Sequence, residues 1–308
     1  MIEFKTGVEG KYRVQLADKD GNIHTDTGFV DNDLLDNFFE DYKRGFDQPN
    51  NSFQYLGTAL RIGTGTTPVN FSQTTLASQV ASFSHSGINN TSEFYLDGTV
   101  GCMDWTWVAT FSLGQIVANV TELGMCWRLG HSENLNSTNR VHSRVVLPTA
   151  VNVTADDQLI VTYKLTARGL EQGNSGTIVL DGTTHNWTAN RGTDIWSSIG
   201  TIRNNLLQPN TNETQCSLRS GAVVLGGFGV AVSGGSATVE SATVTHTNGA
   251  VPGQQIRTYR WGINGANLAG GISSVVFPNG SKFLFDPPIN KTNTKILDLT
   301  LSYTISRV

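Results

Sequence analysis

The chain has 308 residues, a length that favours two domains or one large β domain over one ordinary core. Charged residues make up 15% of it, against about 25% in a typical globular protein, so much of the polar surface must be uncharged. The formal net charge of −4 supplies no basic field for a phosphate backbone, which argues against direct binding of nucleic acid.

The first residues contain no apolar segment of the secretory type, and no later stretch reaches eighteen uninterrupted apolar residues. We therefore expect a soluble chain that is made in a cytoplasm and does not insert into a membrane. The cysteines Cys102, Cys126 and Cys216 lack CxxC spacing, which predicts reduced thiols and no zinc site.

The first predicted element is a β-hairpin. Apolar residues alternate over Tyr12–Leu16, turn residues follow over Asp18–Asn22, and a second short strand is expected near Ile23–Val30. A polar turn between two alternating segments is the usual pattern of two antiparallel strands.

Two short peripheral helices are also predicted. The first covers Asp33–Lys43, where Asp31 or Asp33 can cap the start and apolar residues recur at the spacing of one helical face. The second covers Asp194–Leu207 and has a similar apolar stripe. Both stripes are interpreted as core packing rather than as binding surfaces.

Most other segments have the two-residue alternation of strands, interrupted by Gly, Asn, Asp and Pro clusters. Parallel winding would need a helix between most strands, so the pattern predicts a mainly β protein with antiparallel β-sandwich domains. The clearest predicted strands are Trp105–Leu113, Leu159–Leu165, Gly221–Val232, Ala237–His246 and Leu297–Ile305.

An internal similarity suggests that two sandwich domains are related. Val151–Thr154 matches Ile289–Thr292, and Val161–Thr166 matches Leu299–Thr304 with the same alternation. Chance similarity between β-strands is the competing explanation. The glycine-rich run Ala167–Gly176 is interpreted as a linker or an exposed loop.

We accordingly predict a first domain over residues 1–170, with the hairpin, the first helix and one sandwich, and a second sandwich domain over residues 171–308. Matching strands should bury corresponding side chains in the two cores. These are Leu159, Val161, Tyr163 and Leu165 in one core, and Leu299, Leu301, Tyr303 and Ile305 in the other.

Several phrases of the sequence resemble structural proteins of tailed-bacteriophage particles. Leu60–Pro68 reads LRIGTGTTP and is followed by TTLA at Thr74–Ala77. Val120–Met125 reads VTELGM, and Phe285–Thr292 reads FDPPINKT before the last strand. The phage proteins are similar in having an IGTGTTPP-like turn, a TxL segment and an ITELGL-like turn in this order. The resemblance covers mainly residues 55–168 and 270–308.

The resemblance implies a virion location, synthesis in the cytoplasm of the bacterial host, no cofactor and a role in assembly. It brings no catalytic residue with it. In physical terms, Gly63 and Gly65 are interpreted as permitting positive φ angles and close backbone approach, while Pro68 prevents the strand from continuing. The phrases are therefore expected to specify scaffold geometry.

No catalytic, cofactor-binding or metal-binding residues are predicted. The histidines His24, His85, His131, His142, His185 and His246 are scattered, and no GxSxG motif is present. Two carboxylate pairs could be imagined as a glycosidase acid and base, although turn-forming aspartates at strand boundaries explain them better. These pairs are Asp97 with Asp104, and Asp156 with Asp157.

The six tryptophans have two interpretations. They could form a sugar-stacking face, but Trp105 and Trp107 share one side of a strand, which favours core filling. The full set is Trp105, Trp107, Trp127, Trp187, Trp196 and Trp261.

The leading hypothesis is a non-enzymatic structural protein of a tailed-phage virion, a tail protein that assembles with other copies of itself and with neighbouring virion proteins. The alternative is a receptor- or carbohydrate-binding tail-tip protein, whose partner is a host receptor or glycan contacted by exposed tryptophans in a loop-lined groove. A depolymerase of the cell envelope is a third class, for which no motif is found. The low charge content predicts assembly contacts that depend little on ion pairs.

Overall fold

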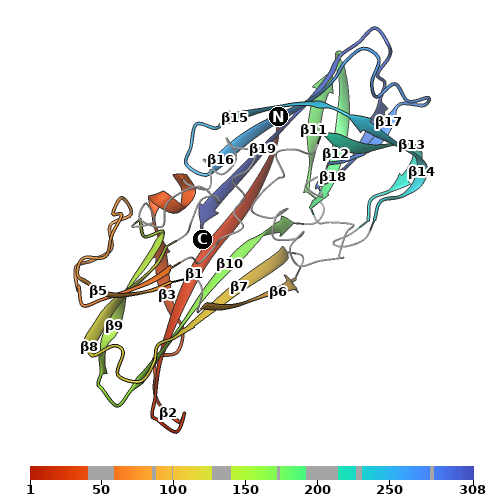
Figure 1. The fold of residues 1–308 in the computed structure, drawn as a ribbon. Coiled ribbons are helices and arrows are strands. Elements are labelled where there is room, and N and C mark those ends of the chain that lie inside the picture. The colour runs from red at the N-terminus through yellow and green to blue at the C-terminus, as the bar shows by residue number, and fades with distance from the viewer. Residues whose placement is uncertain are drawn as a thin grey trace. The chain divides into compact units, whose positions relative to one another are not determined.

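A computed structural model describes residues 1–40, 59–84, 88–98, 100–126, 140–171, 174–191, 214–226, 231–277 and 281–308. In these residues almost all regular structure is β (Figure 1). The strands are β1 (Ile2–Ala17), β2 (Ile23–Asp26), β3 (Val30–Leu34), β4 (Ala59–Gly63), β5 (Gln79–Ser84), β6 (Ile88–Asp97), β7 (Val100–Thr110), β8 (Ala118–Cys126), β9 (Ser143–Val153), β10 (Gln158–Glu171), β11 (Asn174–Leu180), β12 (Thr183–Arg191), β13 (Gln215–Val224), β14 (Ser233–Ser241), β15 (Thr243–Asn248), β16 (Gln254–Trp261), β17 (Ile272–Val276), β18 (Ser281–Ile289) and β19 (Leu297–Arg307).

The strands form two sheets among the described residues. One has thirteen strands, with the path β15-β16-β19-β1-β3-β9-β8-β4-β5 and with β2, β6, β7 and β10 attached beside it. The other has six strands in the order β11-β12-β18-β17-β13-β14. The prediction of a mainly β, sandwich-like architecture is therefore confirmed.

The chain divides into two compact units that are discontinuous in sequence. Unit 1 contains residues 1–6, 95–102 and 168–305, and unit 2 contains residues 7–94, 103–167 and 306–308. Residues 1–6 and 95–102 thus belong to the unit that contains most of the C-terminal half. Residues 306–308 belong to the other unit. The division into domains over residues 1–170 and 171–308 stays a prediction.

Unit 1 has its core between the six-stranded sheet and strands β16 and β19. Phe283 and Phe285 of β18 and Tyr259 and Trp261 of β16 are buried in one hydrophobic cluster with Leu299 of β19. Aromatic contacts connect the layers, with ring centroids 4.5 Å apart for Tyr259 and Phe277. Burial of such large side chains is the main favourable contribution to this unit.

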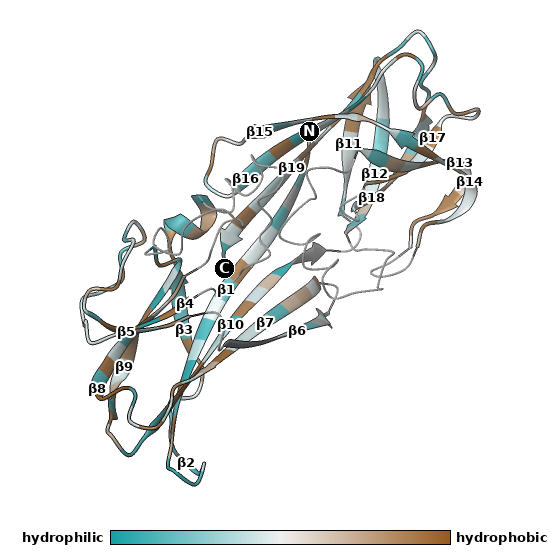
Figure 2. Ribbon diagram, viewed as in Figure 1, coloured by the Kyte–Doolittle hydropathy of each residue, from teal (hydrophilic) through white to brown (hydrophobic). Residues whose placement is uncertain are grey.

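Unit 2 is built around β1, β7 and β10 together with the sheet β9-β8-β4-β5. Tyr12 and Tyr163 are fully buried with ring centroids 4.7 Å apart, and Trp107 stacks on Tyr163 at 5.5 Å. The Tyr12 hydroxyl bonds the Ser143 hydroxyl at 2.9 Å, which satisfies a polar group within the core. Hydrophobic and hydrophilic residues alternate along β1 and β10 (Figure 2).

The predicted N-terminal hairpin and the two predicted core sets are confirmed. β1 pairs antiparallel with β2, with Gln15 opposite Asp26. Every member of the two core sets is buried, and the sets fall in different units. The first set is Leu159, Val161, Tyr163 and Leu165, and the second is Leu299, Leu301, Tyr303 and Ile305.

The predicted start of the first helix is wrong. Asp33 and Leu34 end β3 and pair with Arg144 and Ser143 of β9, so sheet pairing prevails over the local helical pattern. Within the described residues a helix covers only 36–40. The second predicted helix, Asp194–Leu207, lies outside the described residues.

Three strand or linker boundaries also differ from the prediction. The predicted strand Gly221–Val232 ends at Val224. There Val224 of β13 pairs with Ser233, the first residue of the antiparallel strand β14. The predicted strand Ala237–His246 is divided at Ala242, because β14 belongs to one sheet and β15 to the other. The predicted linker Ala167–Gly176 is largely strand, since β10 continues to Glu171 and β11 begins at Asn174.

Candidate functional site

The phrases at Leu60–Pro68, Thr74–Ala77 and Val120–Met125 meet around one buried carboxylate in unit 2. Glu122, in β8, has no exposed surface. Its Oε1 accepts hydrogen bonds from the backbone N–H groups of Gly65 (3.0 Å) and Ser78 (2.7 Å), and its Oε2 accepts one from Ala77 (3.1 Å). A single side chain therefore fastens both ends of loop 64–78 to β8.

Arg144 of β9 completes this centre. It is 1% exposed, and its Nε and Nη2 lie 2.8 and 2.7 Å from Glu122 Oε2. Nη1 donates to Gln73 Oε1 (3.1 Å) and Nη2 to the Thr67 carbonyl (3.0 Å). The guanidinium thus neutralises the carboxylate and also binds the middle of the loop, as buried charges require.

Two glycines of the LRIGTGTTP phrase are explained by the close approach of Glu122. A Cβ atom added at Gly63 or at Gly65 would lie 2.5 Å from Glu122 Oε1. Neither residue is among those with positive φ, so the positive-φ part of our interpretation is wrong and the close-approach part is confirmed. A side chain at either position would displace the carboxylate from its donors.

The TTLA and TELG phrases meet in the same way. Leu76 packs in a small buried cluster with Leu35, Cys126 and Val141. A Cβ added at Gly124 would lie 2.9 Å from Leu76 Cδ2, so this glycine leaves room for the leucine. The phrases accordingly specify the geometry of a loop.

The outer part of loop 64–78 is held by the C-terminal strand. The Arg307 guanidinium lies 4.1 Å from the centroid of the Phe71 ring and 4.7 Å from that of Phe39. Arg307 Nε also donates to the Leu34 carbonyl at 2.6 Å. Phe71 remains 45% exposed, which leaves an aromatic surface on a rigidly held loop.

Asp156 and Asp157 lie in the turn between β9 and β10, as predicted for turn-forming residues. Asp157 Oδ2 accepts hydrogen bonds from the Thr154 N–H (2.8 Å) and hydroxyl (2.7 Å). Asp157 Oδ1 also lies 2.8 Å from His24 Nε2. These bonds, of which those with Thr154 contribute most, lower the pKa of Asp157.

Asp104 does not fit the prediction of a strand-boundary residue. It lies inside β7, is buried, and contacts Lys164 Nζ at 2.6 Å and the Thr166 hydroxyl at 2.6 Å. Asp97 ends β6 and pairs with Arg168 at 2.6 Å. Each carboxylate therefore has a local cationic partner.

The described tryptophans fill cores. Trp105, Trp107 and Trp261 are buried, and Trp187 packs partly buried against the core of unit 1, whereas Trp127 and Trp196 lie outside the described residues. His131 lies outside the described residues as well. In the described part of the chain no three His, Cys, Asp or Glu residues are grouped as a metal site would need.

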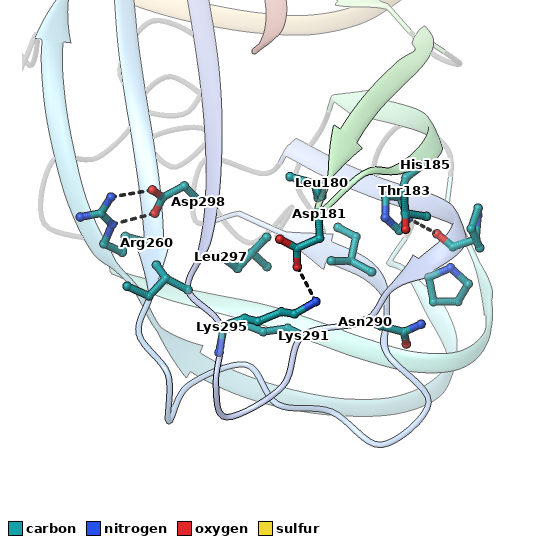
Figure 3. Close-up of a pocket in the computed structure, with 14 residues that line it drawn as sticks. Leu180, Asp181, Thr183, His185, Arg260, Asn290, Lys291, Lys295, Leu297 and Asp298 are labelled. Carbon is teal, nitrogen blue, oxygen red and sulfur yellow. Dashed lines mark hydrogen bonds and ion pairs between the residues drawn. The ribbon is translucent and has the colours of Figure 1, made fainter.

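A cavity of about 440 Å³ opens at one end of unit 1 (Figure 3). On its wall Lys295 pairs with Asp181 at 2.7 Å, and Arg260 makes a bidentate pair with Asp298 at 2.6 and 2.8 Å. The His185 Nδ1–H donates to the Pro287 carbonyl at 2.7 Å. Each ion pair therefore holds its two side chains together on the cavity wall.

The outer edges of the end strands are further candidate surfaces in the described part of the chain. Among the described residues, the six-stranded sheet ends in β11 and β14, and the thirteen-stranded sheet ends in β5 and β15 on its main path and in β2 and β6 on its side branches. Strands β5, β11, β14 and β15 contain no proline or lysine and a single charged residue, Glu240, whereas β2 and β6 carry Asp26, Glu93 and Asp97. Edge strands usually carry such residues because these prevent pairing with another chain. β5, β11, β14 and β15 therefore carry almost none of the residues that discourage further strand pairing.

No family model, curated protein or solved structure matches the chain in the three comparisons made. In the described residues no helix is both long and apolar enough to cross a bilayer.

Proposed function

We propose that the protein is a non-enzymatic structural component of a tailed-phage virion, a tail protein that assembles with its own copies and with neighbouring virion proteins. The observation that carries this proposal is the composition of both end strands of the six-stranded sheet, β11 and β14, and of β5 and β15 in the other sheet, which are almost uncharged. Edge strands without charged residues or proline favour association, because their backbone donors and acceptors can pair with another strand. The phrases that resemble phage proteins build a fixed loop beside β5, which supports the same role.

The alternative, a receptor- or carbohydrate-binding tail-tip protein, depends on exposed tryptophans in a groove. The tryptophans Trp105, Trp107 and Trp261 are buried instead, and no described tryptophan lines the cavity of unit 1. The geometry therefore favours assembly over glycan stacking.

The proposal is tested by locating the protein in the intact particle. Cryo-electron microscopy of virions from the host that makes the protein should show symmetric copies of this fold in the tail. Particles of normal composition that lack the chain would reject the virion assignment. Mass photometry of the purified protein should, in parallel, show species larger than a monomer.

Self-association should be nearly independent of salt. Exposed ion pairs weaken as ionic strength rises, whereas backbone hydrogen bonds and apolar burial persist. The mass distribution should therefore be similar from about 0.05 to 1 M sodium chloride, a range over which the Debye length falls from more than 10 Å to about 3 Å. Complete dissociation by moderate salt, reversed on dilution, would show that clustered charges hold the assembly together.

A further inference from the structure

β14 presents a nearly bare edge at one end of the six-stranded sheet of unit 1 (Figure 1). Eight of its nine residues are exposed, Val239 to 66%, so both faces of the strand are in contact with solvent. Among the described residues it pairs only with β13. A nine-residue strand with one free edge can accept another strand.

The direction of the free backbone groups follows from one hydrogen bond. The Ala242 N–H donates to the Thr214 carbonyl at 2.8 Å, which continues the β13–β14 ladder by one position. In an antiparallel ladder hydrogen-bonded and non-hydrogen-bonded pairs alternate. The N–H and C=O groups of Ala237, Val239 and Ser241 therefore point away from β13, toward solvent.

The opposite edge of the same sheet, formed by β11, has a matching set of outward-pointing backbone N–H and C=O groups. β11 and β12 are joined by Asp181-Gly182, both at positive φ, so the closing pair Leu180–Thr183 is hydrogen-bonded. By the same alternation of hydrogen-bonded and non-hydrogen-bonded pairs, the backbone N–H and C=O groups of Ser175, Thr177 and Val179 point away from β12. These three residues are exposed, Val179 to 64%.

All neighbouring strands of this sheet are antiparallel. The sheet has six strands, so its first and last strands, β11 and β14, run in opposite directions. A second copy that continues the sheet in the same orientation would place its β11 antiparallel to β14. Solvent-facing side chains of both edges would then lie on the same face of the joined sheet.

We propose that β14 of one copy pairs with β11 of the next, an inference that rests on the proposed self-assembly and specifies its contact. In the register that pairs all three outward-pointing residues of each edge, Ala237, Val239 and Ser241 lie opposite Val179, Thr177 and Ser175 of the next copy. The contact contains up to six backbone hydrogen bonds, because each of the three pairs exchanges two. It is a head-to-tail contact, which generates a ring or a filament.

The side chains agree with this register. Val239 lies opposite Thr177, a β-branched pair of the kind that stabilises sheets. Glu240, the only charged residue of either strand, lies opposite Gly176, so no like charges meet. Repulsion between the two edges is therefore absent.

Cross-linking of the full-length chain tests the pairing. In the double variant Val239→Cys with Thr177→Cys, the two sites of adjacent copies should lie about 5.5 Å apart by Cα, within reach of a short bismaleimide. The native Cys102, Cys126 and Cys216 are buried and supply a low background. We expect covalent dimers, trimers and larger species from the double variant, and none above background from either single variant.

A proline variant tests the hydrogen bonds. Val239→Pro removes one outward N–H while the inner ladder to β13 keeps its bonds. It should weaken self-association by roughly tenfold or more, whereas Val239→Thr, which keeps the N–H, should associate like the wild type. Circular dichroism of both variants checks that the fold is retained.

The outcomes separate this inference from the proposed function. Cross-linking of Val239→Cys alone would indicate a twofold β14–β14 contact and overturn the head-to-tail pairing. A wild-type oligomer without cross-links in the double variant would also overturn it, while leaving a virion role intact. A cross-linked series from a protein absent from phage particles would support the pairing and reject the virion role. A strictly monomeric wild type would overturn the pairing.

Discussion

Glu122→Gln is expected to lower the free energy of unfolding by about 3–5 kcal/mol, the usual cost of removing one partner from a buried ion pair. The amide has nearly the shape of the carboxylate, so no cavity is created. It leaves the buried Arg144 without a counter-charge and turns an N–H group toward the donors of Arg144 or Ala77. Chemical denaturation followed by circular dichroism measures the change.

The matched control is an exposed pair. Lys11 and Asp31 lie 3.1 Å apart, with the Asp31 side chain 86% exposed, so Asp31→Asn should cost less than about 1 kcal/mol. A cost for Glu122→Gln as small as that of the control would mean that the buried pair does not hold loop 64–78.

The same variant has a distinct dependence on pH. Burial alone raises the pKa of Glu122, but hydrogen bonds from Ser78 and Ala77 and the bond and charge of Arg144 outweigh it and lower the pKa below its usual value. A carboxyl group with a lowered pKa stabilises the fold above its unfolded pKa of about 4.3, and this contribution is lost as pH falls through the folded pKa. The difference in stability between wild type and Glu122→Gln should therefore diminish as the pH is lowered from 7 into the range below 4.

Gly63→Ala is expected to destabilise the protein by about 2–3 kcal/mol, because the added methyl group overpacks a filled site. Its Cβ would lie 2.5 Å from Glu122 Oε1 and 2.6 Å from the Ser78 carbonyl oxygen. The second contact is with backbone, which cannot rotate away. Thermal and chemical denaturation should both detect the loss.

Gly262→Ala serves as the matched control, since nothing lies within 4 Å of an added Cβ and its φ is not positive. This substitution should be neutral, or stabilising by about 0.4–1 kcal/mol through the unfolded chain. Equal effects of the two substitutions would show that the contact of Gly63 with Glu122 is not what requires the glycine.

Local patterns of the sequence were sufficient for the β architecture, the first hairpin and both core sets. Alternate side chains of a strand point to opposite faces, so the burial of Tyr163 or Leu301 follows from period-two spacing alone. The same rule failed for the first helix, because Asp33 and Leu34 pair with β9, which is distant in the sequence. The break between β14 and β15 at Ala242 was not predicted for a similar reason. The chain passes from one sheet to the other there, while apolar and polar residues continue to alternate in the sequence.

The sequence by itself determined which residues alternate, where turns occur and which phrases are unusual, because these depend on the conformations of neighbouring residues. Only the tertiary structure decided that Gly63, Gly65 and Arg144 meet at Glu122, and that β11 and β14 each keep one edge without a partner strand among the described residues. A hydrogen bond between segments far apart in the chain depends on the register of several strands together. An open edge depends on every strand pairing in its sheet, so neither feature can be derived from a single segment.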